Sequence, residues 1–446
     1  MTENTPPAAA GRDVDLRAIV SLALPALGVL AAPALYLLLD TAVVGRLGAQ
    51  QLAALAAGAT IFGVTTTQLT FLAYGTTARA ARAFGRGDAD AAVREGLQAS
   101  WVASAVGAAL ALVIAVGAPT FTAWLAPDPD ISSAAAAWLR IAACAIPLTL
   151  LSQAGNGWLR GLQNTRAPLI YVLSGLVPAA LAIVPLVAAF GLNGSAMAIV
   201  LGQSIASGSF VLRLLRECHH RGIELHPVAT IIKSQLVLGR DLIVRSLAFQ
   251  VAFLSAAAVA GRVGASALGG HQVMLQLWNL ISLVLDSLAI AAQTLVGAAL
   301  GAGTIATARG TGRQVIAWST AISIAIAAIF ALAGALIVRI FTDEPSVINH
   351  ILAGPWWLLV VMIPIGGVVF AIDGVLLGAG DAAFLRNATV ASVVLGFLPP
   401  VWLAGIFHWG LFGIWCGLLS FMVLRLIFVA WRFRGSSWHS PQPAAQ

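Results

Sequence analysis

Residues 271–301 read HQVMLQLWNLISLVLDSLAIAAQTLVGAALG, and this stretch decides the fold. It is long and apolar enough to cross a bilayer, for which an α-helix needs roughly 20 residues. It nevertheless holds a carboxylate, Asp286, near its middle. Such a group costs about 2.5–3.5 kcal/mol on insertion scales, so intramembrane acids face a protein interior or a water-filled cavity. Asp286 is therefore a candidate functional residue.

Four polar residues recur along this stretch at seven-residue steps: Gln272, Asn279, Asp286 and Gln293. Seven residues at ~100° each fall only ~20° short of two full turns, so these side chains share one stripe of a helix. Gln276 lies one turn along the same face, and the opposite flank is Val, Leu, Ile and Ala. The pattern predicts a helix with one wet side and one dry side.

The composition of the whole chain indicates many helices of this kind. Of its 446 residues, 60% are hydrophobic and only 9% are charged, whereas roughly a quarter are charged in soluble domains. The chain is therefore an all-α polytopic membrane protein. We predict twelve spans, at residues 18–42, 52–76, 97–118, 134–158, 168–190, 194–216, 242–260, 270–297, 315–340, 355–378, 388–407 and 411–431.

The distribution of Lys and Arg predicts the orientation, because cytoplasmic loops retain positive charge. With both termini inside, all but four basic residues, including Arg245 and Arg425, fall in cytoplasmic segments; the four are Arg46, Arg140, Arg262 and Arg339. The net charge of +7 follows from this asymmetry and implies no nucleic-acid partner. The first apolar run lacks a cleavage signal, so we expect it to remain as the first span.

The two halves of the chain resemble each other. VGRLG at 44–48 returns as AGRVG at 260–264, at a shift of 216 residues, and Pro147 returns as Pro364 at a shift of 217. Each half holds six predicted spans, so both halves enter the membrane from the same side, as parallel repeats do. We expect six-helix lobes at 16–216 and 241–434, a cytoplasmic linker at 217–240, and cytoplasmic tails at 1–15 and 435–446.

The linker contains residues that could be read as metal ligands: Cys218, His219, His220 and His226. Their spacing matches no known metal site, so we interpret the segment as a solvated linker and expect no metal. The chain has three cysteines, an odd and scattered set that indicates no disulfide framework.

The first span carries one acid, Asp40, with Tyr36 one turn before it. Burial penalises the charged form of a carboxylate, which suits an acid that loads and releases a proton. Pro33 can bend the helix beside it and act as a hinge. The alternative is a structural ion pair, for which Arg46 is near in sequence but beyond the end of the span.

A third acid, Asp373, lies in FAIDGVLLGAGD at 370–381, in the cytoplasmic half of the tenth span. It is either a further coupling acid or the partner of a cytoplasmic-end arginine such as Arg245 or Arg386, and the sequence leaves both interpretations open. The repeat does not duplicate the three acids Asp40, Asp286 and Asp373, which align with Ala256, Thr70 and Asn156.

Several motifs together resemble the multidrug and toxic compound extrusion (MATE) transporters, and most closely their DinF-like branch: PALYLLLDTAVVGRLG (33–48), GLQNT (161–165), RSLAFQVAF (245–253), LDSLAIAAQTLVG (285–297) and FAIDGVLLGAGD. The resemblance covers nearly the whole chain. It implies twelve helices in two lobes that export amphipathic, often cationic, compounds in exchange for protons or sodium. It also implies that Asp40 and Asp286 are the coupling acids of the first and eighth helices.

One departure from the family pattern bears on the coupling ion. Many members carry Asn and Asp on the fifth helix, where this chain has Val177, Ala180 and Val184. Sodium needs several oxygen ligands, whereas a proton needs one acceptor. The departure favours proton coupling, with sodium as the alternative.

We therefore predict a monomeric antiporter of the bacterial inner membrane that works without a cofactor. Enzyme motifs such as His-Glu-x-x-His or a nucleophile elbow do not occur. The alternative is a flippase for a lipid-linked precursor or an exporter of an endogenous metabolite. A flippase that binds phosphate would favour a cationic cavity. We find no intramembrane Arg or Lys stripe that could form one. The expected cleft residues are Tyr36, Phe71, Tyr74, Phe249, Gln272, Gln276, Trp278, Asn279 and Gln293.

Overall fold

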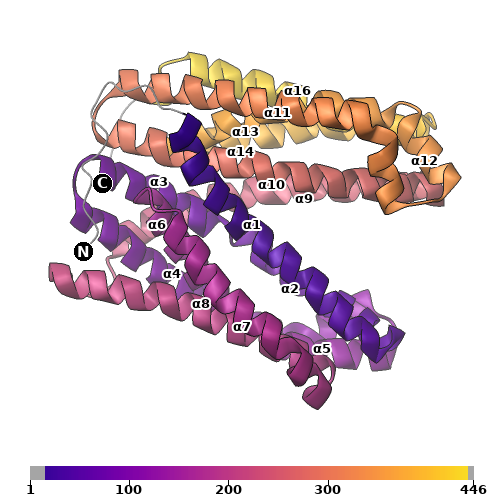
Figure 1. Cartoon of the computed structure of the whole chain (residues 1–446), viewed down its shortest axis with the longest axis horizontal. Helices are drawn as coiled ribbons and strands as arrows, with labels where there is room; N and C mark the ends of the chain where they lie inside the picture. The colour runs from indigo at the N-terminus through magenta and orange to yellow at the C-terminus, as the bar shows by residue number, and fades with distance from the viewer. Residues whose placement is uncertain (1–15, 440–446) are drawn as a thin grey trace. The chain divides into compact units, whose positions relative to one another are not determined.

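A computed structural model of the chain describes residues 16–439, and nearly all of these are helical. The first half contains α1 (Leu16–Val44), the short 3-10 turn η1 (Gly45–Leu47), α2 (Ala49–Gln68), α3 (Phe71–Gly85), α4 (Ala89–Leu125), α5 (Pro129–Ala143), α6 (Ala145–Gly161), α7 (Arg166–Phe190) and α8 (Leu192–Arg221). The second half contains α9 (Ala229–Val263), α10 (Ala265–Gly301), α11 (Ile305–Phe341), α12 (Pro345–Leu352), α13 (Pro355–Gly378), α14 (Ala382–Ala391), the π-helical η2 (Ser392–Phe397), α15 (Leu398–Ile406) and α16 (Gly410–Arg434) (Figure 1).

The predicted fold class is confirmed. Over residues 16–439 there are 11 candidate membrane spans, or 12 when the bent pair α5 and α6 is counted as one span, and no strand occurs in this range. The two helices of the pair meet at 42°. Pro147 explains the bend, because its ring clashes with the carbonyl of the residue four positions earlier, which is Ala143, the last residue of α5.

The chain forms two compact units. The N-lobe is Leu24–Gly239, and the C-lobe runs from Arg240 onward and includes the start of α1 up to Ala23. Within the N-lobe, α3, α4, α6 and α8 pack on one another, and within the C-lobe α10, α11, α13 and α16 do the same (Figure 1). Predicted tail residues 1–15 and 440–446 lie outside the described range.

The internal repeat is visible in the backbone. Left-handed residues in one half have left-handed counterparts in the other: Gly48 and Gly264 (φ 118° and 143°), Gly87 and Gly303 (74° and 76°), Gln163 and Gly380 (59° and 73°), and Gly191 and Gly410 (58° and 62°). A positive φ is costly for any residue with a Cβ, so glycine is expected at such turns. Gln163 is the one non-glycine among these eight positions, and the two halves still make the same turns.

The repeat also preserves one close helix crossing. In the N-lobe, Gly157 of α6 lies against the carbonyl of Ala73 in α3. In the C-lobe, Gly374 of α13 lies against the carbonyl of Ala289 in α10, at the equivalent positions. A Cβ on either glycine would collide with that backbone oxygen. Both lobes therefore hold their central helices at a separation that only glycine permits.

One element differs between the halves. The N-lobe counterpart of α10 is broken into α2 and α3 at Leu69–Thr70, where the Thr70 hydroxyl donates to the Thr67 carbonyl at 2.9 Å. In the C-lobe the aligned residue is Asp286, in the interior of the uninterrupted helix α10.

Candidate functional site

The N-lobe contains a buried carboxylate that is linked to two other helices. Asp40 on α1 is 1% exposed, and the Ser195 hydroxyl on α8 is a neighbour of its carboxyl group. Ser195 in turn accepts a hydrogen bond from Nε1 of Trp138 on α5, at 3.1 Å. Because the Ser195 oxygen accepts from the indole, its own hydrogen can point at the carboxylate. The three residues form a row of polar groups from α5 to α1, with one hydrogen bond between Trp138 and Ser195.

The surroundings of Asp40 contain a second buried polar group. Tyr36, one turn earlier on α1, places its hydroxyl near the carboxylate, and over residues 16–439 neither the Tyr36 hydroxyl nor Asp40 Oδ1 has a hydrogen-bond partner. Arg46, the alternative partner suggested by sequence, is exposed on η1. Pro33 lies two turns before Asp40 within α1, which continues as a helix through it.

The C-lobe treats its buried acid differently. Asp373 on α13 is 3% exposed and pairs through Oδ2 with Arg245 on α9, at 2.6 Å, and with Arg425 on α16. Both guanidinium groups lie over the ring of Phe249, 5.8 and 4.9 Å from its centroid, where cations are attracted to the ring face. Of the two interpretations of Asp373, the structure shows the ion pair with Arg245.

Two arginines of the C-lobe take part in the packing of its helices. Arg245 on α9 and Arg425 on α16 belong to candidate membrane spans, and Arg425 is 2% exposed. A buried charge is tolerated when it is paired. Asp373 pairs with both arginines, and Asp286 adds a second negative charge near Arg425. The acid in the tenth span was the signal that a basic partner lies at the same depth.

Asp286 belongs to the same region of the C-lobe. It is half-buried on α10 and interacts electrostatically with Arg425. The polar residues that share its stripe differ in burial along the helix. Gln272, Gln276 and Asn279 are exposed, whereas Gln293 is 1% exposed. Gln293 is buried because its backbone carbonyl faces Gly378 at the close crossing with α13.

The predicted aromatic cleft residues divide into two groups. Phe71 and Trp278 are each 6% exposed and pack inside their own lobes, Phe71 against Gly239 and Trp278 against Phe370. They present little surface to a ligand in this structure. Tyr74 and Phe249 are half-buried, and Phe249 supports the two arginines.

Arg386, the other arginine that the sequence suggested as a partner of Asp373, pairs with a different acid. It pairs with Asp241 at 2.6 Å, and Arg432 pairs with Asp381 at 2.6 Å. These ion pairs join α9 to α14 and α16 to the residue that precedes α14. These charges at the end of the C-lobe that carries α14 thus hold helices together.

The linker between the two halves is fastened to α4 by hydrogen bonds. α8 continues to Arg221 and α9 begins at Ala229. Between them, the side-chain amide of Gln98 on α4 donates to the His226 carbonyl at 3.0 Å and accepts from the Val228 amide at 2.7 Å. The Trp101 indole donates to the Leu225 carbonyl at 3.0 Å. Glu224, Leu225, His226 and Pro227 are nevertheless exposed, so the segment is in contact with solvent while two side chains of α4 bind its backbone.

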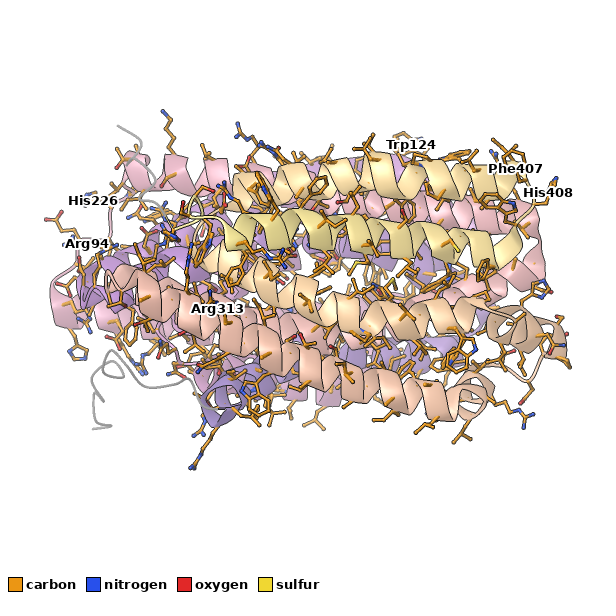
Figure 2. The ribbon with its side chains drawn as sticks, turned by 90° about the horizontal axis from the view of Figure 1, so that it is seen from above. Arg94, Trp124, His226, Arg313, Phe407 and His408 are labelled. Carbon is orange, nitrogen blue, oxygen red and sulfur yellow. The ribbon has the colours of Figure 1, made fainter. Side chains whose placement is uncertain are left out.

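In each lobe, taken by itself, basic residues lie at one end and exposed aromatic residues at the other, which is called here the apolar end (Figure 2). In the N-lobe, Arg94 and His226 lie at the end opposite Trp124, and in the C-lobe Arg313 lies far from Phe407 and His408. Aromatic residues gather at the interfaces of membrane proteins, and basic residues gather on the cytoplasmic side.

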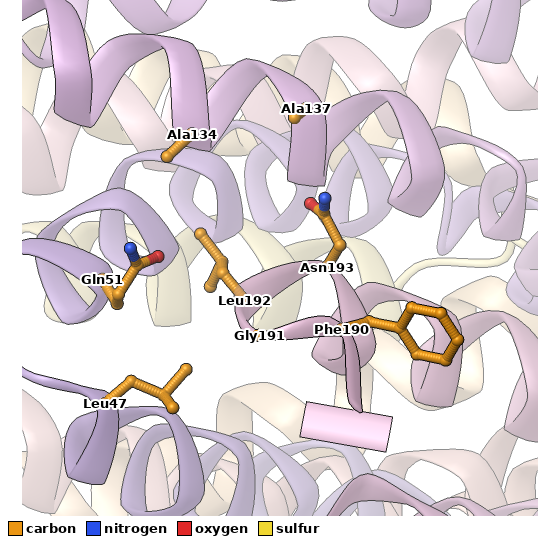
Figure 3. A pocket seen from close by; sticks show the side chains of 8 residues that line it. All are labelled: Leu47, Gln51, Ala134, Ala137, Phe190, Gly191, Leu192 and Asn193. Atoms are coloured by element: carbon orange, nitrogen blue, oxygen red, sulfur yellow. The ribbon is translucent and has the colours of Figure 1, made fainter. Parts of the chain in front are cut away.

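The N-lobe also carries a pocket of about 400 Å³ at its apolar end. Figure 3 shows Gln51 and Asn193 on opposite sides of it, with the remaining wall from α5, η1 and the turn between α7 and α8. Its lining residues are Leu47, Gln51, Ala134, Ala137, Phe190, Gly191, Leu192 and Asn193.

Two lobes of membrane-spanning helices, built on one repeated plan and each with a buried acid, define an α-helical membrane transporter. The MatE family model matches residues 25–186 and 242–402, one match in each half. The chain therefore belongs to the MATE family, as the motifs predicted, and its members are transporters of small molecules and not enzymes.

Relatives and solved structures agree with this assignment. The chain is 30% identical over 431 residues to the chloroplastic protein DETOXIFICATION 44 of Arabidopsis thaliana, covering 93% of this chain and 81% of that protein. It is 27% identical to the DNA damage-inducible protein F of Escherichia coli, covering 90% and 89%. A crystal structure of a MATE transporter in a bent conformation superposes with a TM-score of 0.83 at 21% identity, covering 95% and 96%.

Proposed function

We propose that the protein is a secondary antiporter that exports amphipathic, often cationic, small molecules in exchange for protons. The observation that carries this proposal is Asp40: an acid within a membrane span, 1% exposed, held by a neutral hydroxyl, with Oδ1 unbonded in the described chain. An intramembrane acid without a basic partner can take up and release a proton.

In the proposed mechanism, a proton from the outer side neutralises Asp40. The neutral and charged forms favour different arrangements of the protein, since a ligand shifts a conformational equilibrium by its differential affinity for the two states. Substrate leaves as the acid is protonated, and Pro33 is the proposed hinge of α1. Asp286 is the proposed acid of the C-lobe, and Gln272, Gln276 and Asn279 are exposed polar groups further along the same helix.

The proposed ion is the proton and not sodium. At the fifth-helix positions where many family members have Asn and Asp, α7 presents Val177, Ala180 and Val184. Sodium would need several oxygen ligands there. We further propose a monomer in the bacterial plasma membrane with both termini cytoplasmic.

The experiment is export of a fluorescent cationic dye from cells that carry the wild-type chain, Asp40→Asn or Asp286→Asn. Export is driven in turn by a proton gradient and by a sodium gradient, at equal expression. We expect proton-driven export by the wild type and its loss in both variants. A wild type that moves the dye only with sodium, or variants that export normally, would contradict the proposal.

A second candidate function is favoured by Arg245 and Arg425, which place two guanidinium groups inside the spans of the C-lobe. Arginine is well suited to bind carboxylate or phosphate. A lipid-linked precursor or an anionic metabolite is therefore the alternative substrate class. Export of an anionic dye that stops in Arg425→Met, with no export of cationic dye by the wild type, would favour this candidate.

A further inference from the structure

We infer that the pocket at the apolar end of the N-lobe is the outer entrance through which protons reach Asp40, along a route contained in that lobe. This inference rests on the proposed proton exchange. It assigns a role to a pocket and to two side chains, Trp138 and Ser195, that the sequence motifs did not single out.

Two walls of the pocket lead directly to the residues around Asp40. Ala134 in the wall from α5 is followed four residues later by Trp138, and Leu192 in the wall from α8 is followed three residues later by Ser195. Residues three and four apart lie on the same face of a helix, one turn from each other. Trp138 and Ser195 therefore lie one turn deeper than the pocket.

The wall from α2 reaches the same depth. Gln51 lines the pocket, and Gly58, two turns further along α2, lies so close to the Trp138 ring that a Cβ would stand 2.6 Å from Cε3. Asp40 lies two turns below Leu47, the pocket residue that follows α1. Four segments of the pocket thus converge on the row of polar groups from Trp138 through Ser195 to Asp40.

The chemistry of this row assigns different roles to its members. A hydroxyl both donates and accepts, whereas an indole only donates. Ser195 can therefore give its proton to the Asp40 carboxylate while its oxygen takes a proton from a hydronium ion on the pocket side. The net change is one proton moved from water to Asp40. Trp138 cannot carry this proton and acts as a positioning residue for Ser195.

The size and polarity of the pocket suit this role. A water molecule occupies about 30 Å³ of liquid volume and needs polar partners to be held, and the pocket offers about 400 Å³ with the amides of Gln51 and Asn193. Its lining side chains carry no formal charge, so they would not trap the ion. Next to the carboxylate, the titratable neighbour is Tyr36 on the same helix, and the neighbour on α8 is the neutral Ser195.

The test is chemical closure of the pocket from outside. Asn193→Cys is made in a background without the native cysteines, because Cys144 is exposed and would react as well. Cells are treated with a bulky, membrane-impermeant methanethiosulfonate reagent, and proton-driven export of the cationic dye is measured before and after. The matched control is Ser133→Cys, an exposed α5 position outside the pocket lining.

We expect labelling of Asn193→Cys to slow proton-driven export by about tenfold, a barrier increase of ~1.4 kcal/mol, and labelling of Ser133→Cys to leave it unchanged. Dye binding to the purified labelled protein should stay the same, which separates a blocked proton route from misfolding. Unchanged export after labelling, failure of the thiol in the Asn193→Cys variant to react from outside, or equal losses in both variants would overturn the inference.

A second pair of variants tests the relay without any label. Ser195→Ala should slow proton-driven export with dye binding retained, and Ser195→Thr, which keeps the hydroxyl, should restore it. Equal export by the alanine and threonine variants would overturn the relay. If the unlabelled protein shows no proton-driven export at all, the proposed function falls and this inference with it; normal export that resists labelling removes the inference alone.

Discussion

The two lobes share a backbone plan but treat their buried acids in opposite ways. In the N-lobe, Asp40 is held by the neutral Ser195, whereas in the C-lobe Asp373 is held by two arginines, one of them 2% exposed. An acid without a basic partner suits the proposed proton exchange, whereas an acid between two cations holds together the helices that carry them. The comparison teaches that a repeated fold can surround its buried acids with opposite chemistry.

The largest expected effect concerns the acid of the N-lobe. Asp40→Asn keeps the size and hydrogen-bonding capacity of the side chain but cannot take up a proton. We expect proton-driven export to fall by about 100-fold or more, the scale on which acid–base groups contribute, with little change in thermal stability. Export that persists at the wild-type rate would remove the distinction between the two acids.

The next effect concerns the acid of the C-lobe and should appear as lost stability. Asp373→Asn leaves Arg245 and Arg425 without their counter-ion, and breaking a buried pair by removing one partner costs about 3–5 kcal/mol. We expect a lower melting temperature in detergent. The double variant with Arg425→Met should recover part of this loss, because one uncompensated charge is gone. A normal melting temperature for Asp373→Asn would indicate that the ion pair is not structural.

A smaller effect should be equal in the two lobes. Gly157→Ala and Gly374→Ala each place a methyl group against a backbone carbonyl of the neighbouring helix. Overpacking of this kind costs about 1–3 kcal/mol, so both variants should melt at lower temperature by similar amounts. A large effect in one lobe alone would show that the crossings are not equivalent. Gly208→Ala, which meets no neighbouring atom within 4 Å, is the control.

The smallest effect concerns the one turn where the repeat departs from glycine. Gln163 has φ 59°, and its counterpart Gly380 has φ 73°. A residue with a Cβ in the left-handed region costs roughly 1–2 kcal/mol of folding free energy relative to glycine. Part of this advantage of glycine is lost because glycine makes the unfolded chain more flexible. We expect Gln163→Gly to raise stability slightly and Gly380→Ala to lower it by about 1 kcal/mol, as measured by thermal melting. Opposite signs would show that other contacts dominate these turns.

Helix number, repeat and family followed from hydropathy and from motifs such as VGRLG and AGRVG, because the membrane imposes long apolar spans and repeated turns need the same glycines. The positions of Asp40 and Asp286 within spans were visible for the same reason. Partners could not be read from the sequence. Ser195 lies far from Asp40 along the chain, and Arg425 stands inside a run that still counts as apolar.

The period of the sequence pattern also did not predict which residues of one face are buried within a lobe. The seven-residue stripe predicts a common face for Gln272 and Gln293, but burial at a given point depends on the neighbouring helix. α13 approaches the end of α10 through Gly374 and Gly378 and covers Gln293 there. A one-dimensional pattern specifies which residues share a face, and only the packing decides where that face is covered.

The attachment of the linker to α4 bears on how the protein is made. Gln98 and Trp101 bind the backbone at Leu225, His226 and Val228, so the contacts that fasten this segment are complete before most of the C-lobe has left the ribosome. Domains of a growing chain fold in order, N-terminal first. The second half of the polypeptide would then begin insertion from an anchored starting point, with the segment before its first long helix already tied to α4.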